Sequence, residues 1–468
     1  MDLHKFHYQN RKAVDMTDCT IGPLSFSSFN RRQFVADFKG GDLTSDGGLG
    51  LLREVDRKIG LIDAFDRAIH DPRRPWLIEH DQRTLLAQRI FAIAAGYEDL
   101  NDHQTLRDDT LLKALTERRP NGRRGQDEAL SSPSTLCRLE NRVTRDDLVG
   151  MAQALVEAFV ASHEAPPEEL VLDFDATDDA IHGNQQGRFF HGYYDHYCFL
   201  PLYVTCGQQL LAAYLRPSNI DAARHSRAIL KLLVDRFRRA WPEVRIVFRA
   251  DSGFCRWKLL RWCDRHGVDY VVGLARNAVL KRLSRRSRVQ ARWTYRRTGV
   301  KQRLFEAFDY AAGTWDRRRR VVAKAEHGKR GENPRFIVTS LDGDPQDLYD
   351  RLYCQRGDAE NRIKEQQLGL FADRTSCHDF LANQFRVLLS AAAYVLIETL
   401  RRVGLAGTEL AGAQSGTIRL KLLKIGARVV RSVRRLVVHL ASGYPMRRTF
   451  ETVVRRLRDW RCLPIPDP

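Results

Sequence analysis

The hydrophobic pattern of the chain changes at Pro166 and Pro167, and this change restricts the possible folds more than any other feature. Before the two prolines, apolar residues recur at helical spacing. After them come short apolar runs, in the order strand, two strands, helix, strand, helix and strand. A mixed sheet flanked by helices fits this order best, so we predict an α/β fold preceded by an all-helical region.

The expected elements can be placed by residue number. Strands are expected at residues 170–175, 200–205, 210–215, 244–248 and 270–274, and helices at residues 220–241 and 257–266. The very basic residues 278–336 contain short alternating runs at 303–310 and 319–324, which predict further strands. A helix returns at residues 347–369.

The charge balance indicates a polyanionic partner. Lys and Arg total 77 against 58 Asp and Glu, which gives a net charge of +19. Nucleic acid is the usual partner of so basic a chain, and an acidic membrane surface comes second. Hydrophobic residues make up 43% of the chain, which is enough to build a core and excludes an intrinsically disordered protein.

Cysteine usage and the apolar stretches predict a cytoplasmic protein. The nine cysteines are odd in number and none are spaced as CxxC, which argues against a disulfide framework and a zinc cluster. Isolated thiols of this kind are typical of the cytosol. Residues 1–30 lack the pattern of a signal peptide. The most apolar stretch, residues 387–400, is too short and interrupted to span a bilayer, so we expect a buried helix and no membrane partner.

Three acidic residues stand where the expected elements could bring them together. Asp175 ends the first strand of the sheet, Asp251 follows the strand at residues 244–248, and Glu360 lies on the later helix. Carboxylates at the ends of adjacent strands can converge, and their oxygens suit Mg²⁺ or Mn²⁺. Two such ions about 4 Å apart can activate an attacking oxygen and stabilise a leaving oxygen in phosphoryl transfer. Taken singly, each acid also fits a turn, a helix N-cap or a solvated helix position.

The residues around Glu360 carry a known spacing. Tyr353, Arg356 and Glu360 match the order Tyr, two residues, Arg, three residues, Glu, six residues, Lys that one branch of the DDE transposases has on its Glu helix. Gln367 stands at the Lys position, and Lys364 lies one helical turn after Glu360. The chain thus resembles the DDE transposases of bacterial insertion sequences, and nearly its whole length is similar to the insertion-sequence family 1380. The wider resemblance rests on Leu43-Thr-Ser-Asp-Gly-Gly, Asp173-Phe-Asp-Ala-Thr, His182-Gly, Arg249-Ala-Asp-Ser-Gly-Phe and Arg335-Phe-Ile-Val-Thr-Ser.

The resemblance implies an RNase H-like mixed sheet as the catalytic core and a division of the chain into five parts. The parts are a mostly helical DNA-binding region at 1–165, a first part of the core at 166–277, a basic β-rich insertion at 278–336, a second part of the core with the Glu helix at 337–380, and a basic C-terminal region at 381–468.

The resemblance also implies a function, cut-and-paste transposition of an insertion sequence by a nucleoid-associated bacterial enzyme. Asp175, Asp251 and Glu360 would hold two Mg²⁺ or Mn²⁺ ions for hydrolysis at the transposon ends and for strand transfer. Terminal inverted-repeat DNA and target DNA would be the partners, and the protein would be a homodimer on DNA. The residues expected to contact DNA are Tyr353, Arg356 and Lys364.

Two alternatives remain open in the sequence. Asp173 faces the same side of its strand as Asp175 and is a second candidate for the first acid, although Asp175-Ala-Thr fits the family pattern better. The function could also be that of an RNase H-like nuclease without strand transfer, or of an inactive DNA-binding relative.

Two further parts of the chain are expected to contact DNA. A helix at residues 134–142, with Arg138 and Arg142 on one face, could read the transposon ends. Aromatic residues among the arginines of the basic insertion could stack on an unpaired base or belong to the core; they are Trp293, Tyr295 and Trp315.

Overall fold

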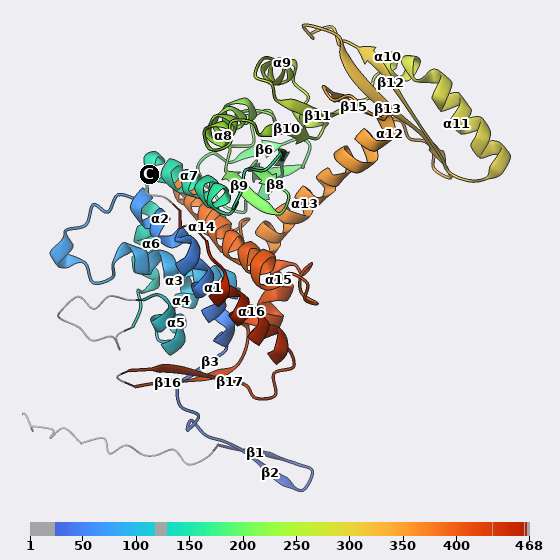
Figure 1. The fold of residues 1–468 in the computed structure, drawn as a ribbon. Helices are drawn as coiled ribbons and strands as arrows, with labels where there is room; N and C mark the ends of the chain where they lie inside the picture. The colour runs from blue at the N-terminus through green and yellow to red at the C-terminus, as the bar shows by residue number, and fades with distance from the viewer. Residues whose placement is uncertain (1–23, 118–128, 433, 463, 466–468) are drawn as a thin grey trace, which may run out of the picture.

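The molecule consists of a helical body, a mixed sheet beside it and an arm that extends from the sheet (Figure 1). The computed structural model describes residues 24–117, 129–432, 434–462 and 464–465. The body combines helices from the beginning and the end of the described chain, which share one large hydrophobic cluster. The sheet and the arm come from the residues between them.

Nine strands form the main sheet, in the order β12–β13–β15–β11–β10–β4–β8–β9, with β14 pairing with β13. The strands β4, β10 and β11 run parallel, and the others join antiparallel. All the strands expected from the sequence are present, and the mixed α/β fold is confirmed. The bounds are β4 Glu169–Ala176, β8 Leu202–Cys206, β9 Gln209–Tyr214, β10 Arg245–Ala250, β11 Asp269–Leu274, β12 Gln302–Tyr310, β13 Arg319–Gly328, β14 Gly331–Glu332 and β15 Arg335–Thr339.

Alternation along the strands gives the sheet two different faces. On one face, Phe174 of β4 and Phe248 of β10 pack with the helices α8 (Ser226–Ala240) and α9 (Trp257–Arg265). On the other face, Val247 and its neighbours pack against a helical segment that leads to Glu360. The odd-numbered residues of β4 point to this second face, so the candidate acids lie under the Glu360 helix. The helix α8 starts later than expected because His225 takes a left-handed backbone conformation, with φ at 69°.

The helical body is built around α14 (Phe380–Thr399). With its continuation to Gly404, this is the one helix in the described residues that is long and apolar enough to cross a membrane, and 89% of its most apolar window is buried. The expectation of a buried helix at residues 387–400 is therefore confirmed. The elements around it are α1 Gly50–Ile59, α2 Leu61–Ala68, α3 Gln82–Ala95, α4 His103–Leu106, α5 Thr110–Leu115, α6 Pro133–Arg142, α7 Arg145–Ala161, α15 Ser415–Ile418, α16 Arg447–Asp459 and the short strands β3 Leu43–Thr44, β16 Ala427–Arg431 and β17 Leu436–Leu440.

The arm contains the two strands that the sequence predicted, β12 and β13, and two helices that it did not. The helices are α10 (Ala278–Leu283) and α11 (Arg285–Thr298). Only Ser287 and Ala291 of α11 are buried, so the helix lacks the apolar stripe that a periodicity argument requires. Because β12, β13 and β15 continue the main sheet, the arm is an extension of it and has no separate sheet. The division of the chain into five parts stays a prediction.

A helical segment at residues 345–369 runs from the arm down to the body (Figure 1). Its pieces are α12 Pro345–Asp347, η5 Leu348–Tyr353, η6 Cys354–Arg356, α13 Gly357–Lys364 and η7 Glu365–Gly369. The helix expected at 347–369 is therefore present, but η5 and η7 are π-helical turns, which occur frequently at functional sites. Its lower end is anchored by the buried Glu365, which accepts hydrogen bonds from Arg362 (2.6 Å) and Arg401 (3.1 Å).

Candidate active site

The strands β4 and β10 place the first two candidate acids side by side. The two strands are parallel neighbours, with Asp173 opposite Arg249 and Phe174 opposite Ala250. Asp175 follows Phe174 and Asp251 follows Ala250, so both acids lie at the carboxyl ends of two neighbouring strands. Their carboxylates are close enough that the charge of Asp251 acts on the pKa of Asp175.

Asp251 also has the local role that its position after a strand suggested. Its Oδ1 accepts a hydrogen bond from the backbone N–H of Gly253 at 2.8 Å, which caps the short turn η4 (Ser252–Phe254). One oxygen of the carboxylate is therefore committed to the turn, and this bond holds the side chain at the sheet edge.

Arg356 connects the first acid with the third. Its Nη1 lies 3.1 Å from Oδ2 of Asp175, and its Nη2 lies 2.6 Å from Oε1 of Glu360. Glu360 is half-exposed, whereas Asp175 and Arg356 are mostly buried. Burial opposes the charge of the guanidinium, but the carboxylates of Asp175 and Glu360 raise the pKa of Arg356. The guanidinium thus lies between two carboxylates.

The carboxyl group of Asp175 is strongly perturbed. Burial raises its pKa to about 7; Arg356 opposes this shift, and the nearby charges of Asp251 and Glu360 add to it. A carboxyl group in a site crowded with other carboxylates gains from a bound cation, since the cation removes their mutual repulsion. Perturbed groups of this kind are enriched at functional sites.

Asp173 has a different environment from Asp175. Its two oxygens accept hydrogen bonds from Nε (2.5 Å) and Nη2 (2.6 Å) of Arg249, and both side chains are buried. The third nitrogen of Arg249, Nη1, donates to the backbone carbonyl of Leu352 at 2.6 Å. Asp173 is therefore committed to a structural pair, which ties β4 and β10 to the helical segment that carries Glu360.

Arg249 is the residue that the sequence analysis missed. Apart from the exposed Arg245 at its start, the rest of β10 is apolar. A buried arginine in such a strand requires an anionic partner. Arg249 also precedes Asp251 by two residues, as Asp173 precedes Asp175. This matched spacing could have predicted that Arg249 pairs with Asp173. The prediction requires the register of the two parallel strands, which the sequence does not provide.

Tyr353 lies against the strand β11. A methyl group at Gly273 would stand 2.6 Å from the Tyr353 hydroxyl and 2.8 Å from the backbone nitrogen of Ser252. Glycine is therefore needed at this position for the helix to approach the turn that follows Asp251. Tyr353 is near the acids, but its ring is partly buried.

On the Glu helix, the position where the family pattern has Lys is occupied by Gln367, which makes a structural contact. The side chain of Gln367 donates to the backbone carbonyl of Asp178 at 2.9 Å, and so holds the loop that follows Asp175. Lys364 is exposed, one turn after Glu360. It is the lysine of this helix that remains available to a ligand.

The three acids fit a divalent cation by their chemistry. Asp175, Asp251 and Glu360 offer only oxygen donors, which hard cations such as Mg²⁺ prefer. As the side chains are placed, however, the described residues contain no group of three His, Cys, Asp or Glu side chains that could hold a metal ion. The guanidinium of Arg356 lies between Asp175 and Glu360. A cation shared by these two carboxylates requires Arg356 to turn away.

The helix α6 is only partly suited to read DNA. Arg138 is exposed, as expected. Arg142, however, donates to Gln82 at 2.6 Å and lies 3.3 Å from Asp71, so it holds the helical body together. The two arginines are one turn apart on α6, as expected, but the last turn of the helix packs against the loop after α2 and the start of α3. The role of this helix in reading DNA stays a prediction.

The aromatic residues of the arm have different environments. Trp293 on α11 is 58% exposed, with the guanidinium of Arg297 over its ring. Tyr295 packs against His327, and Trp315 packs against Tyr310 at the edge of the sheet core. Trp315 is therefore a core residue, and Trp293 is the exposed tryptophan of the arm.

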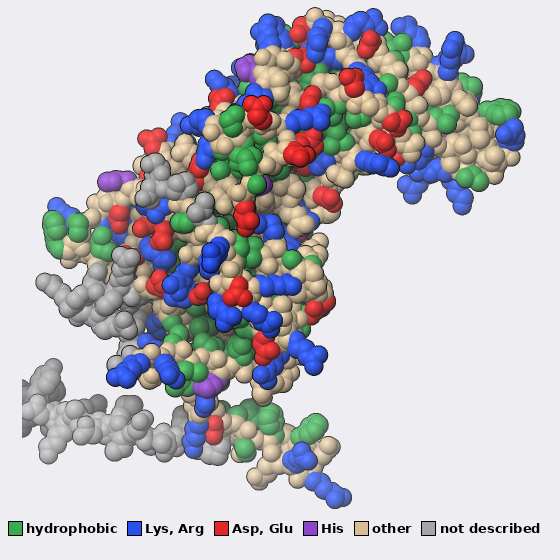
Figure 2. All heavy atoms as spheres, in the orientation of Figure 1, with side chains coloured by type: hydrophobic (Ala, Val, Ile, Leu, Met, Phe, Trp, Pro, Cys, Tyr) green, Lys and Arg blue, Asp and Glu red, His purple; other side chains and the backbone are tan. Residues whose placement is uncertain are grey.

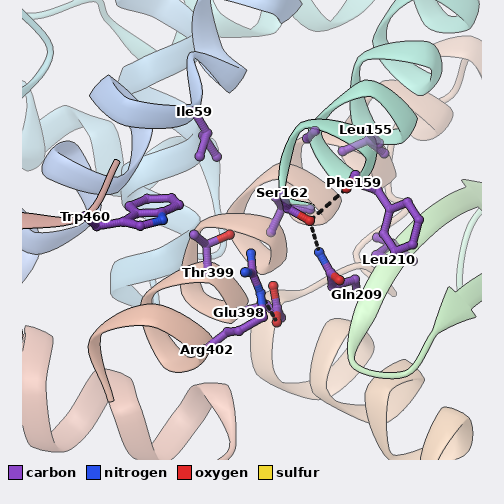
Figure 3. Close-up of a pocket in the computed structure, with 12 residues that line it drawn as sticks. Ile59, Leu155, Phe159, Ser162, Gln209, Leu210, Glu398, Thr399, Arg402 and Trp460 are labelled. Carbon is purple, nitrogen blue, oxygen red and sulfur yellow. Dashed lines mark hydrogen bonds and ion pairs between the residues drawn. The ribbon is translucent and has the colours of Figure 1, made fainter. Parts of the chain in front are cut away.

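A small pocket elsewhere in the molecule contains none of the candidate residues (Figure 3). It lies where α7, β9 and the end of α14 meet. Ser162 accepts a hydrogen bond from Gln209 at 2.9 Å, and Arg402 lies 3.3 Å from Glu398. These polar groups pair with one another, so the pocket is part of the packing contact between the helical body and the sheet.

Comparison with known proteins identifies the family to which the chain belongs. No curated protein matches the chain in sequence. The cryo-EM structure of the piggyBac transposase synaptic complex with hairpin DNA is similar at 10% sequence identity and a TM-score of 0.44, over 81% of this chain and 80% of that chain. A family model described as Transposase DDE domain group 1 matches residues 26–462, a range that includes all three acids. Enzymes of the DDE type cleave and transfer DNA strands and use divalent metal ions. Because the match spans nearly the whole chain, this protein belongs to the DDE transposases, in the family Transposase DDE domain group 1.

Proposed function

We propose that this transposase moves a bacterial insertion sequence of family 1380 by a cut-and-paste reaction, with Asp175, Asp251 and Glu360 as its catalytic acids. One observation carries the proposal. Asp175 and Asp251 end adjacent parallel strands, and Arg356 links Asp175 to Glu360 on the helix above. The charges of Asp251 and Glu360 both act on Asp175 and add to its raised pKa, a costly arrangement that a cation-dependent reaction explains.

The three acids would hold two divalent ions, Mg²⁺ or Mn²⁺, which when bound activate the attacking oxygen and stabilise the leaving oxygen. In the first step, water attacks the phosphorus at the transposon end, and the DNA 3′-oxygen leaves and takes up a proton. In the second step, that 3′-hydroxyl attacks a phosphodiester of the target DNA. One target strand is joined to the transposon, and the 3′-oxygen of the other target fragment leaves.

Three residues of the Glu helix would bind the DNA backbone. Arg356, once it turns away from the carboxylates, can donate two parallel hydrogen bonds to a phosphate. Lys364 is exposed on the same helix and can contact a phosphate as a point charge. Tyr353 lies beside the turn of Asp251 and can position the strand next to the acids. Terminal inverted-repeat DNA and target DNA are the substrates, and a homodimer would hold the two ends together.

The test is cleavage of a duplex that carries the transposon end, in Mg²⁺. We expect Asp251→Ala and Glu360→Ala to lose cleavage while DNA affinity in a chelator stays within about twofold, because carboxylates do not attract phosphate. Asp358→Ala is the matched control, since Asp358 is an exposed acid on the same helix. Cleavage by Asp251→Ala at the wild-type rate would falsify the mechanism.

A second assay separates a transposase from a nuclease of the same fold. Pre-cut transposon ends with a free 3′-hydroxyl are mixed with supercoiled target DNA and Mg²⁺. A transposase joins the ends to the target in a reaction that Glu360→Ala abolishes. Hydrolysis of the intact end without any joining would identify a nuclease. Sedimentation with and without end DNA would show whether a homodimer forms.

A further inference from the structure

A hairpin beside the first acid has an unusual concentration of aromatic side chains. Its strands are β6 (Phe189–His191) and β7 (His196–Phe199), and residues 189–197 read Phe-Phe-His-Gly-Tyr-Tyr-Asp-His-Tyr. The short strand β5 (Asp179–Ala180) completes a three-stranded sheet with them. This small sheet is inserted between β4, which carries Asp175 near its end, and β8, the neighbour of β4 in the main sheet.

One side of the hairpin is fixed to the protein. Cys198 and Phe199 are buried, and the backbone carbonyl of Phe189 accepts a hydrogen bond from Ser218 at 2.8 Å. Nε2 of His196 lies 2.9 Å from Oδ2 of Asp178, whose backbone carbonyl is held by Gln367. The hairpin is therefore a fixed platform.

The other side and the tip are open to solvent. Phe190 and Tyr197 form a cross-strand pair with ring centroids 5.7 Å apart, and the guanidinium of Arg188 lies 4.9 Å from the centre of the Tyr197 ring. The exposed fractions are 53% for Phe190, 48% for Tyr197 and 85% for Tyr193 at the tip. Adjacent aromatic rings exposed to this extent, with a cation on one of them, mark a binding surface.

The hairpin lies close to Asp175, because His196 of the hairpin is 2.9 Å from Asp178, three residues after Asp175 in the chain. In agreement with this, burial first, and then the charges of Asp178 and Asp175, raise the pKa of Tyr194, which is next to Tyr193 in the tip, to about 12. The rings of Tyr193 and Tyr194 are 5.0 Å apart. A DNA strand held at Asp175 therefore passes within reach of the hairpin tip.

We propose that the hairpin Phe189–Tyr197 binds unpaired DNA bases next to the cut site, which stack on the exposed rings of Phe190, Tyr193 and Tyr197. The inference rests on the proposed function, since that function brings DNA to Asp175. Flat rings beside a guanidinium suit nucleobases, because every base offers a flat π-surface whatever the sequence. The surface offers few aliphatic side chains, which a protein partner would use for burial, and the net charge of +19 favours a polyanion.

The test compares the affinity of the full-length protein for two duplexes of the same sequence in a chelator. One duplex has a four-nucleotide single-stranded extension, and the other is fully paired. We expect wild type to bind the extended duplex about tenfold more tightly, a preference that Phe190→Ala with Tyr193→Ala removes. Tyr193→Phe should retain the preference, because the ring is kept. Trp76→Ala, which removes a 75% exposed ring from the helical body, is the matched control.

Three outcomes would overturn the inference. They are a preference that persists in the double alanine variant, an equal loss of affinity for both duplexes, and a change of oligomeric state in that variant without DNA. The last would identify the hairpin as a contact between two copies of the chain. Cleavage in Mg²⁺ is measured separately with wild type. If wild type cleaves and the double variant keeps the preference, the hairpin inference alone fails. If wild type does not cleave but the double variant loses the preference, the proposed function alone fails.

Discussion

At the scale of single residues, Asp173 and Asp175 are two residues apart and have different partners. Asp173 accepts two hydrogen bonds from the buried Arg249. We expect Asp173→Ala to lower the free energy of unfolding by about 3 kcal/mol or more, because it leaves a buried guanidinium without its anion. Chemical denaturation measures this change. Asp350→Ala is the control, since it removes a more exposed ion pair with Arg303 and should cost less than about 1 kcal/mol. Equal losses in both variants would contradict the assignment of Asp173 as a structural residue.

Replacing Asp175, unlike replacing Asp173, should raise the stability of the protein, and the size of this effect should depend on pH. Its pKa in the folded protein is about 7, against 3.8 for the free side chain. The folded state therefore holds this proton more tightly than the unfolded state, and the stability that the proton provides is lost as the pH rises through about 7. In a chelator, Asp175→Asn should melt a few degrees above wild type at pH 8, and the difference should shrink as the pH falls until the two melt together below about pH 4. A lower melting temperature for Asp175→Asn at pH 8 would show that Asp175 stabilises the fold.

At the scale of elements, the contact between β11 and the Glu helix depends on Gly273. A methyl group there would meet the Tyr353 hydroxyl at 2.6 Å and the backbone of Ser252 at 2.8 Å. Backbone atoms cannot move aside without moving the turn of Asp251. We therefore expect Gly273→Ala to separate the helix from the strand edge and to lower the cleavage rate at least about tenfold, as misplaced catalytic groups do. DNA affinity in a chelator should change little.

A nearby glycine provides the control for that substitution. Gly357 starts α13, and a methyl group there would have no atom within 4 Å. Gly357→Ala should keep the wild-type cleavage rate and slightly raise the stability, because alanine favours a helix. Gly273→Ala with Tyr353→Phe should recover part of the activity, since it removes the closest contact. If Gly273→Ala cleaves at the wild-type rate, the fit between strand and helix is unimportant for the reaction.

The sequence predicted most elements of the sheet, for a physical reason. Buried strands such as β4, β10 and β11 contain short apolar runs, which can be recognised from the sequence alone. The helix α11 was missed because its buried stripe consists of Ser287 and Ala291, which carry little hydrophobic signal. The π-helical turns could not be predicted from the sequence either, since they depend on the packing of the Glu helix between the arm and the body.

The candidate site was only partly predictable. The positions of Asp175, Asp251 and Glu360 followed from the strand order and the spacing of the Glu helix. The role of Arg249 did not, because a pair between neighbouring strands depends on their register. Nor could the sequence indicate that Arg356 lies between Asp175 and Glu360, since side chains 181 residues apart meet only in the folded chain.

At the scale of the whole molecule, one sheet runs from the candidate active site into the arm, where basic side chains gather (Figures 1 and 2). Residues 278–305 contain no acidic residue. The helix α11 buries only Ser287 and Ala291, so most of its arginines are exposed. The arm therefore presents a positive surface connected through the strands to the acids, and a duplex bound at the acids can lie along it.

This arrangement predicts which charges set the salt dependence of DNA binding. Each arginine in contact with a phosphate contributes about 0.9 to the slope of log affinity against log salt concentration. Arg292→Gln with Arg296→Gln on α11 should therefore reduce the slope by about 1.8, measured with a duplex of any sequence in a chelator. Arg448→Gln with Arg455→Gln on α16 removes the same charge from exposed positions on the opposite part of the molecule. If DNA lies along the arm, only the α11 pair changes the slope by this amount. Equal changes in both pairs would mean that net charge alone attracts DNA and that the arm has no special role.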